Sequence, residues 1–115
     1  MSQIQILHNP RCSKSRQTLQ LLEQRDIKPQ VTEYLKTPLK AQELMVLKNK
    51  LGLDTFRQMM RIKEELYREL ELKQASEERL LQALVEYPVL LERPVVIKGD
   101  QARIGRPPEQ VLDIL

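Results

Sequence analysis

Cysteine and histidine are almost absent from this chain of 115 residues, which contains one of each. The single cysteine, Cys12, cannot form an internal disulfide, and together with His8 it does not make a cluster with metal-ligand spacing. We therefore expect neither a disulfide nor a metal to stabilise the fold, and no metal in a functional site. If Cys12 takes part in redox chemistry, the partner thiol must come from another molecule.

Long apolar runs are also missing. No stretch approaches the roughly 20 residues that a membrane-spanning helix needs, and the N-terminus lacks the basic-then-apolar layout of a secretory signal. The 19 Lys and Arg residues are interspersed with 16 Asp and Glu residues, so the small positive excess fits a small oxyanion better than a nucleic acid. We expect a cytoplasmic protein without a membrane or nucleic-acid partner, and a monomer.

The first third of the chain predicts a strand, a helix and a second strand. The aliphatic stretch at 3–7 stops at Asn9-Pro10, which favours a buried strand followed by a loop. Apolar and small residues recur at helical spacing over 13–25. The β-rich stretch at 29–35 then predicts the second strand, with Val31 and Tyr34 on opposite sides.

The middle of the chain, 37–87, predicts a block of helices. Thr37 followed by Pro38 is typical of a helix start, and Gly52 of its end. One or two short helices follow over 54–72, and Ser76 is expected to cap another helix. The arginines of this block other than Arg61 are interpreted as solvated surface charges: Arg57, Arg68 and Arg79.

The last part of the chain predicts a hairpin and a helix. Strands at 94–100 and 101–105 are expected to pair about a Gly-Asp turn, and Pro107-Pro108 to start a helix with Val111, Leu112 and Leu115 inside. The whole order is typical of one α/β domain, 1–115, with a thioredoxin-like fold and a helical insertion between the second and third strands. In such folds the loop after the first strand lies at the edge where ligands bind.

The segment LHNPRCSKSR, residues 7–16, places Cys12 just ahead of a predicted helix. A helix N-terminus carries about half a positive charge and unpaired N–H groups, which lower the pKa of a thiol there. Ser15 and Arg16 add a hydroxyl donor and a cation beside backbone donors suited to anions. An inert buried cysteine is the usual alternative, but the charged neighbours favour a reactive thiolate. His8 can reach the sulfur or its anion, or it is a polar strand-end residue bonded to the backbone; both remain open.

Two further arginines precede prolines at the edges of predicted elements. Arg93 comes before Pro94 and Arg106 before Pro107, and the proline restricts the backbone of the residue ahead of it. A cis bond at Arg93-Pro94 would hold the adjacent side chain in a defined direction. In proteins of the thioredoxin-like fold, a proline at the start of the third strand faces the cysteine, so Pro94 indicates part of the site.

Four motifs in order resemble the glutaredoxin-dependent arsenate reductases, the ArsC family. They are HNPRCSKSR followed by QTL, MMRIKEELY, YPVLLERPVVI, and GRPPE before a terminal VLDIL. The resemblance runs over essentially the whole chain and is specifically to a short type with one cysteine. It places the nucleophile of the family on Cys12, and the histidine and loop arginine near the nucleophile on His8 and Arg16. It places the oxyanion-binding arginines on Arg61, Arg93 and Arg106.

This resemblance implies reduction of arsenate to arsenite and a role in arsenical resistance. The Cys12 thiolate would attack arsenic and expel water or hydroxide, while the arginines neutralise the oxygens. Glutathione would then attack the cysteine-bound arsenic and reduce it, and glutaredoxin would resolve the cysteine–glutathione disulfide. Glutathione is thus implied as a co-substrate and glutaredoxin as a partner, with no bound cofactor.

Two other functions remain as alternatives. One is a regulator like the Spx proteins, which share the fold and bind RNA polymerase, but the Cys12-Ser13-Lys14-Ser15 segment lacks the second cysteine of their redox switch. The other is a monothiol oxidoreductase that acts on glutathione mixed disulfides. That activity would need Cys12 but neither Arg61 nor Arg106.

Overall fold

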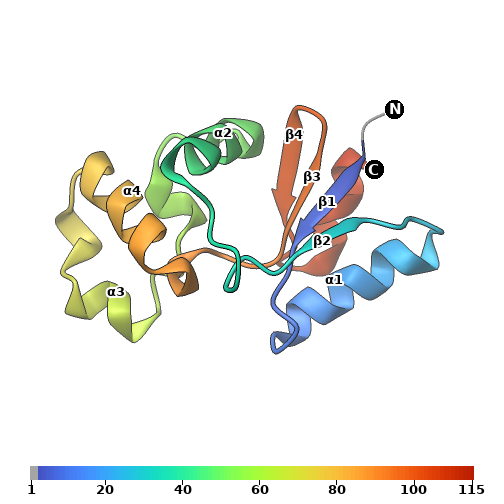
Figure 1. Cartoon of the computed structure of the whole chain (residues 1–115), viewed down its shortest axis with the longest axis horizontal. Coiled ribbons are helices and arrows are strands. Elements are labelled where there is room, and N and C mark those ends of the chain that lie inside the picture. Colours follow the sequence, from blue (N-terminus) through green and yellow to red (C-terminus); the bar gives the residue numbers. More distant parts are fainter. Residues whose placement is uncertain (1–2) are drawn as a thin grey trace. The chain divides into compact units, whose positions relative to one another are not determined.

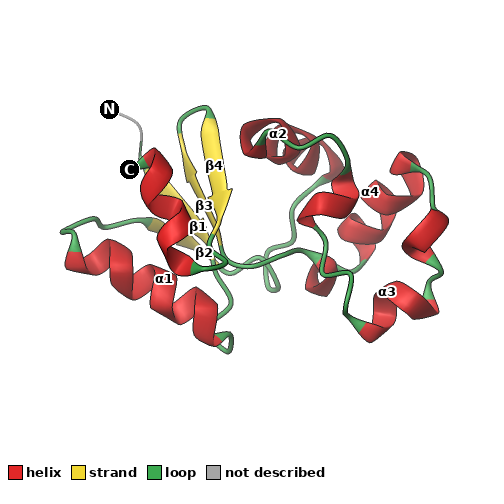
Figure 2. Ribbon diagram, turned by 180° about the vertical axis from the view of Figure 1, so that it is seen from behind, coloured by secondary structure: helices red, strands yellow, loops and turns green. Residues whose placement is uncertain are grey.

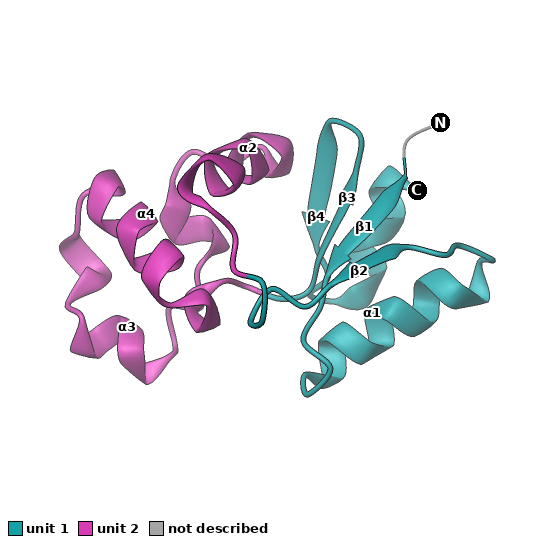
Figure 3. Ribbon diagram, in the orientation of Figure 1, with its two compact units in different colours: residues 1–37, 93–115 teal, residues 38–92 magenta. Residues whose placement is uncertain are grey.

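The computed structural model describes residues 3–115, which divide into two compact units (Figure 3). Unit 1 is the chain up to Thr37 together with Arg93–Leu115, and unit 2 is Pro38–Glu92. Unit 2 therefore covers the helical block expected over 37–87 and continues to Glu92. That the two units act as one domain stays a prediction.

Unit 1 is built on a four-stranded sheet with the order β2-β1-β3-β4 (Figure 1). Its strands are β1 (Ile4–Leu7), β2 (Gln30–Thr32), β3 (Val95–Lys98) and β4 (Gln101–Ile104). β1 pairs in parallel with β2 and antiparallel with β3, so that Ile6 lies opposite both Val31 and Val96. β3 and β4 form the expected antiparallel hairpin. This α/β arrangement confirms the predicted thioredoxin-like fold.

Two helices of unit 1 share a core with this sheet (Figure 2). They are α1 (Ser13–Gln24) and the 3-10 helix η4 (Pro108–Ile114). The core consists of Ile6, Leu22, Val96, Val111 and Ile114. Within α1 the buried positions recur at helical spacing, which confirms the helix predicted over 13–25.

The C-terminal helix differs from the prediction in its period. A 3-10 helix has three residues per turn, so Pro108, Val111 and Ile114 line its buried side. Of the predicted inner positions, Val111 is buried, Leu115 is half-buried and packs against the core of unit 1, and Leu112 is half-buried. The prediction is therefore confirmed at Val111 and Leu115, and it missed Pro108 and Ile114 because it assumed the wider turn of an α-helix.

The second strand is also shorter than the predicted stretch at 29–35. The N–H groups of Lys36 and Thr37 both donate to the Glu33 carbonyl, at 2.9 and 3.0 Å. This turn ends the extended backbone soon after Thr32. Tyr34 nevertheless points inward and is 1% exposed.

Unit 2 is built mainly from helices, with one isolated antiparallel bridge between Met60 and Leu91. Its elements are α2 (Ala41–Leu51), η1 (Phe56–Met59), α3 (Glu65–Glu69), η2 (Leu72–Gln74), α4 (Glu77–Glu86) and η3 (Pro88–Leu90). Gly52 ends α2 with a φ of 70°, and the Ser76 hydroxyl accepts the Arg79 N–H at the start of α4, as predicted. The start predicted at Thr37-Pro38 was wrong: the Lys40 N–H donates to the Glu43 carboxylate, and α2 begins at Ala41.

Arg57 is not the solvated surface charge that the sequence suggested. Its Nε donates to the Tyr67 hydroxyl at 2.9 Å, and its Nη2 donates to the carbonyls of Leu72 and Ala75 at 3.0 and 3.2 Å. One guanidinium thus joins η1 to α3 and η2. Sequence could not show this because the acceptors, one tyrosine hydroxyl and two backbone carbonyls, are brought together only by the fold.

In the part of the chain that the structure describes, no helix has the length and apolar character needed to cross a membrane.

Candidate functional site

Cys12 lies at the junction between the loop after β1 and the first turn of α1, where it is the N-cap residue. Its backbone N–H donates to the Asn9 carbonyl, and its own carbonyl accepts from the Arg16 N–H, both at 3.0 Å. The residue is 8% exposed. Loop and helix therefore both hold the buried sulfur in place.

Opposing effects act on the pKa of the Cys12 thiol. Burial raises the pKa, but a hydrogen bond from the Arg93 side chain lowers it, as do the charge of Arg93 and the backbone N–H groups of Ser15 and Lys14. The net pKa is lowered below that of an ordinary thiol. The thiolate, which is the nucleophilic form, is therefore more readily formed here than in an ordinary thiol.

Arg93 and Arg106 reach the sulfur from the two ends of the β3–β4 hairpin. Arg106 Nη2 lies 3.7 Å from Cys12 Sγ, and Arg106 Nε donates to the Arg93 carbonyl at 2.8 Å. Burial lowers the pKa of Arg93, but hydrogen bonds with Cys12 and Tyr34, and the charges of both, raise it overall. Both arginines are thus held beside the sulfur as permanent cations.

One donor of this pair has no protein acceptor. The Nε atom of Arg93 is buried and forms no hydrogen bond with any of residues 3–115. A buried donor normally has a partner, so this N–H is suited to an acceptor that is not part of the chain. The peptide bonds Arg93-Pro94 and Arg106-Pro107 that follow the two arginines are both cis.

His8 interacts with the loop through Ser15. His8 Nδ1 lies 2.6 Å from Ser15 Oγ, and the same oxygen accepts the Asn9 N–H at 3.0 Å. Burial lowers the pKa of His8, as does the charge of Arg16, against an opposing effect of Glu33. With Asn9 donating to Ser15 Oγ, the network fits a neutral imidazole that accepts the Ser15 hydroxyl proton at Nδ1. The imidazole of His8 thus contacts Ser15, and this contact holds the loop that carries Cys12.

The other predicted residues of unit 1 hold the backbone around the sulfur. Arg16 Nη1 donates to the Pro10 carbonyl at 2.8 Å, which closes the loop onto the first turn of α1. Pro94 is buried, and its carbonyl accepts the Gly105 N–H at 2.8 Å. Unit 1 therefore brings together every predicted site residue except Arg61.

Arg61 lies in unit 2, between η1 and α3. Its backbone N–H donates to the Leu90 carbonyl at 2.7 Å. Its guanidinium forms ion pairs with Glu64 at 3.1 Å and with Glu92 at 3.9 Å. Within its own unit Arg61 is thus held by two carboxylates, and its part in an oxyanion site stays a prediction.

Sequence reasoning missed Tyr34 and Asn9 as parts of the site. Tyr34 reads as one more strand residue, and its interaction with Arg93 joins residues 59 positions apart. Asn9 had a signal that could have been used: Asn Oδ1 often accepts the N–H two residues on, and here it accepts the Arg11 N–H at 3.0 Å.

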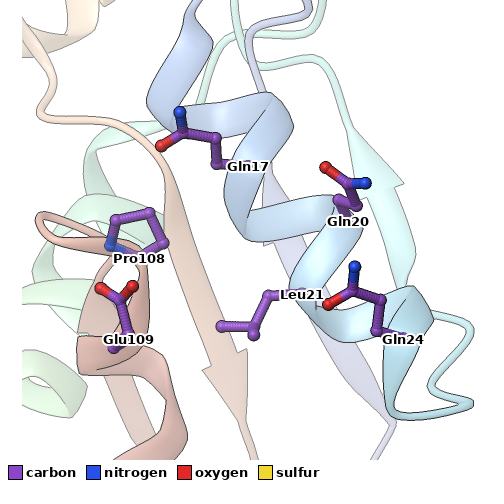
Figure 4. A pocket seen from close by; sticks show the side chains of 6 residues that line it. All are labelled: Gln17, Gln20, Leu21, Gln24, Pro108 and Glu109. Carbon is purple, nitrogen blue, oxygen red and sulfur yellow. The ribbon is translucent and has the colours of Figure 1, made fainter.

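A second feature of unit 1 is a shallow pocket between α1 and η4 (Figure 4). It is lined by Gln17, Gln20, Leu21, Gln24, Pro108 and Glu109. These residues do not include Cys12 or the two arginines beside it, so this pocket is separate from the thiol site. Among residues 3–115, no three His, Cys, Asp or Glu side chains are grouped to hold a metal ion.

Comparison with known proteins gives consistent matches over nearly the whole chain. The ArsC family model matches residues 7–114. The chain is 53% identical over 115 residues to the uncharacterized protein YfgD of Escherichia coli (strain K12), covering 98% of this chain and 97% of that protein. It is 52% identical over 112 residues to an arsenate reductase of Haemophilus influenzae, covering 96% and 97%. A solved arsenate reductase from Vibrio cholerae is similar with a TM-score of 0.96 and 54% identity, covering 99% and 98%.

Proposed function

The chain belongs to the ArsC family, and on this premise we propose that it reduces arsenate to arsenite with glutathione and glutaredoxin as thiol donors. The observation that carries the proposal is the pair of guanidiniums at one sulfur: Arg106 Nη2 lies 3.7 Å from Cys12 Sγ, and Arg93 donates a hydrogen bond to the same atom. The relatives named arsenate reductase at 52% and 54% identity support the choice of substrate.

In the first step the Cys12 thiolate attacks the arsenic of a bound arsenate. A sulfur–arsenic bond forms, one arsenic–oxygen bond breaks, and the departing oxygen leaves as water or hydroxide. Negative charge then gathers on the remaining oxygens, where positioned cations and N–H groups stabilise it. The lowered pKa of Cys12 makes the nucleophilic thiolate easier to form for this attack.

Arg93 and Arg106 have related tasks in this step. The unpartnered Nε of Arg93 supports a role in donating to an arsenate oxygen. Arg106 is fixed through Nε by the Arg93 carbonyl, so its planar fork is oriented before the anion arrives. The family resemblance supplies Arg61 as the third cation, which would exchange its carboxylate partners Glu64 and Glu92 for the oxyanion.

The second half of the reaction requires two thiols from outside the chain. Glutathione attacks the Cys12–arsenic adduct, two electrons pass to arsenic, and arsenite leaves while a Cys12–glutathione disulfide remains. Glutaredoxin then attacks this disulfide, takes up the glutathione and restores the Cys12 thiolate. Because the chain has only one cysteine, neither reducing thiol can be internal.

A coupled assay with purified protein, arsenate, glutathione, glutaredoxin and glutathione reductase tests this function through NADPH oxidation. We expect arsenate-dependent turnover that stops when glutaredoxin is left out and is abolished in Cys12→Ser. Arg61→Ala and Arg93→Ala should each reduce kcat/KM for arsenate at least about tenfold. The matched control is Arg79→Ala, whose side chain faces Gln82 on the surface of α4. If Arg79→Ala reduced kcat/KM as much as Arg61→Ala and Arg93→Ala, the assignment of the oxyanion-binding arginines would be wrong.

Turnover no higher than that of Cys12→Ser would overturn the proposed substrate. If the same preparation reduced a glutathione mixed disulfide, the monothiol oxidoreductase would replace it as the function. These two results can be separated because the second activity does not need arsenate.

A further inference from the structure

Gly105 lies at a close contact between α1 and the end of the hairpin. A Cβ atom added to Gly105 would lie 2.7 Å from Thr18 Oγ1, 2.9 Å from Pro94 Cγ and 3.3 Å from Thr18 Cγ2. These distances are shorter than the roughly 3.5–4.0 Å of relaxed carbon contacts. The φ of Gly105 is not in the left-handed region, so the requirement for glycine here is one of space and not of backbone conformation.

The neighbour that would have to yield is itself held in place. Thr18 is fully buried, and its hydroxyl donates to the Lys14 carbonyl at 2.8 Å within α1. Thr18 belongs to the same rigid helix whose first turn carries the Cys12 sulfur. The Gly105–Thr18 contact therefore sets how closely the segment that contains Arg106 approaches that helix.

Arg106 follows Gly105 directly, and the backbone on both sides is fixed. The Gly105 N–H donates to the Pro94 carbonyl, and Arg106 Nε donates to the Arg93 carbonyl, both at 2.8 Å. A displacement at Gly105 would thus also move the Arg106 guanidinium, whose Nη2 lies 3.7 Å from Cys12 Sγ. A hydrogen bond to sulfur does not tolerate a much longer distance.

We propose that Gly105 and Thr18 form a spacer that positions the Arg106 guanidinium at the Cys12 sulfur. Gly105 is a positioning residue: it acts through Arg106 and touches no reacting atom. The inference rests on the proposed function in one respect: the Arg106 guanidinium that the spacer positions is proposed to bind the anion that Cys12 attacks. The spacer itself is a property of the chain without substrate.

The test is Gly105→Ala, measured through alkylation of Cys12 by two reagents of similar size. Iodoacetate is an anion and iodoacetamide is neutral, so the ratio of their rates reports positive charge at the sulfur while the thiolate fraction cancels. We expect the ratio in Gly105→Ala to fall at least about threefold, towards that of Arg106→Ala, because the guanidinium is moved away. The control is Gly52→Ala: Gly52 has a positive φ but no atom near an added Cβ, so it costs stability without changing the ratio.

Two double variants separate positioning from general damage. In Arg106→Ala the further change Gly105→Ala should leave the ratio unaltered, because the group that the spacer positions is already gone. Gly105→Ala combined with Thr18→Ala removes the contacts to Thr18 but leaves the one to Pro94, so the ratio should lie between wild type and Gly105→Ala. If Gly105→Ala alone does not fold, this second double variant is measured instead and should still fall below wild type.

A folded Gly105→Ala with the wild-type ratio would overturn the spacer, as would a further decrease of the ratio in the Arg106→Ala background. If Gly105→Ala does not fold, the spacer would be overturned by a wild-type ratio of alkylation rates in the double variant Gly105→Ala, Thr18→Ala. None of these alkylations contains arsenate. A failure of the spacer therefore shows in the rate ratio, and a failure of the proposed function shows only in the coupled assay.

Discussion

Arg106 Nη2 lies 3.7 Å from Cys12 Sγ across 94 positions of the chain. The contact exists because β3 and β4 form a hairpin whose two ends lie together, with Arg93 before β3 and Arg106 after β4. The parallel β1–β2 pair and α1 place the sulfur in the same unit. The site is thus a thiol with two arginines beside it, each supplied by a different loop.

The two arginines should stabilise the Cys12 thiolate to different extents. Arg93 donates a hydrogen bond to the sulfur and is a principal cause of its lowered pKa, so Arg93→Ala should raise that pKa the most. At neutral pH the rate of alkylation by iodoacetamide should then fall about threefold or more. Arg106→Ala should act in the same direction but less.

Arg103 provides the matched control for this titration. It lies on β4 and pairs with Asp113 at 3.8 Å and with the Ala102 carbonyl at 2.7 Å. Arg103→Ala removes the same charge from unit 1 and should leave the rate–pH profile of Cys12 unchanged. A shift as large as that of Arg93→Ala would mean that net charge, and not the local contacts, sets the thiol pKa.

Ser15 should contribute measurably to stability through its buried hydroxyl. In Ser15→Ala, His8 Nδ1 and the Asn9 N–H both lose their partner in a buried place. We expect the free energy of unfolding to fall by about 1–3 kcal/mol, measured by urea denaturation. Ser13→Ala, at an exposed position in the same turn, should cost much less, and similar losses for the two variants would contradict the network.

His8 should titrate below its ordinary pKa of 6.5, because burial disfavours the imidazolium. The chain has one histidine, so a single imidazole signal in NMR spectra reports this pKa directly. As the pH falls, the ring is therefore protonated at a higher pH in the unfolded chain than in the folded chain. The contribution of neutral His8 to the free energy of unfolding is therefore complete above pH 6.5. It is lost as the pH falls from 6.5 through the pKa of His8 in the folded chain.

The control for this pH dependence is His8→Asn, which keeps a polar group near Ser15 without an ionisable ring. Its stability should decline less between neutral and mildly acidic pH than that of the wild type. A histidine signal that titrates above 6.5 would instead indicate a charged ring stabilised by Glu33, the one group that raises its pKa.

The sequence by itself determined most of the local structure, and it predicts Cys12 as the nucleophile. Periodicity located α1 and the hairpin, because an amphipathic helix and paired strands follow patterns of neighbouring residues. The polar neighbours of Cys12 predict a reactive thiol for the same reason: the groups that lower its pKa include the N–H groups of its own helix turn. The errors lay where distant contacts decided, as at Arg57, and where the helix type differed from the one assumed, as in η4.

Only the tertiary structure decided which distant groups meet the sulfur and how closely. The contacts of Arg93, Tyr34 and Arg106 depend on strand order and register, which no single segment encodes. The same holds for Gly105, whose sequence neighbours give no sign that a Cβ there would lie 2.7 Å from Thr18. Local sequence sets which groups are available, whereas the distances that control charge and packing arise only when elements far apart in the chain share one core.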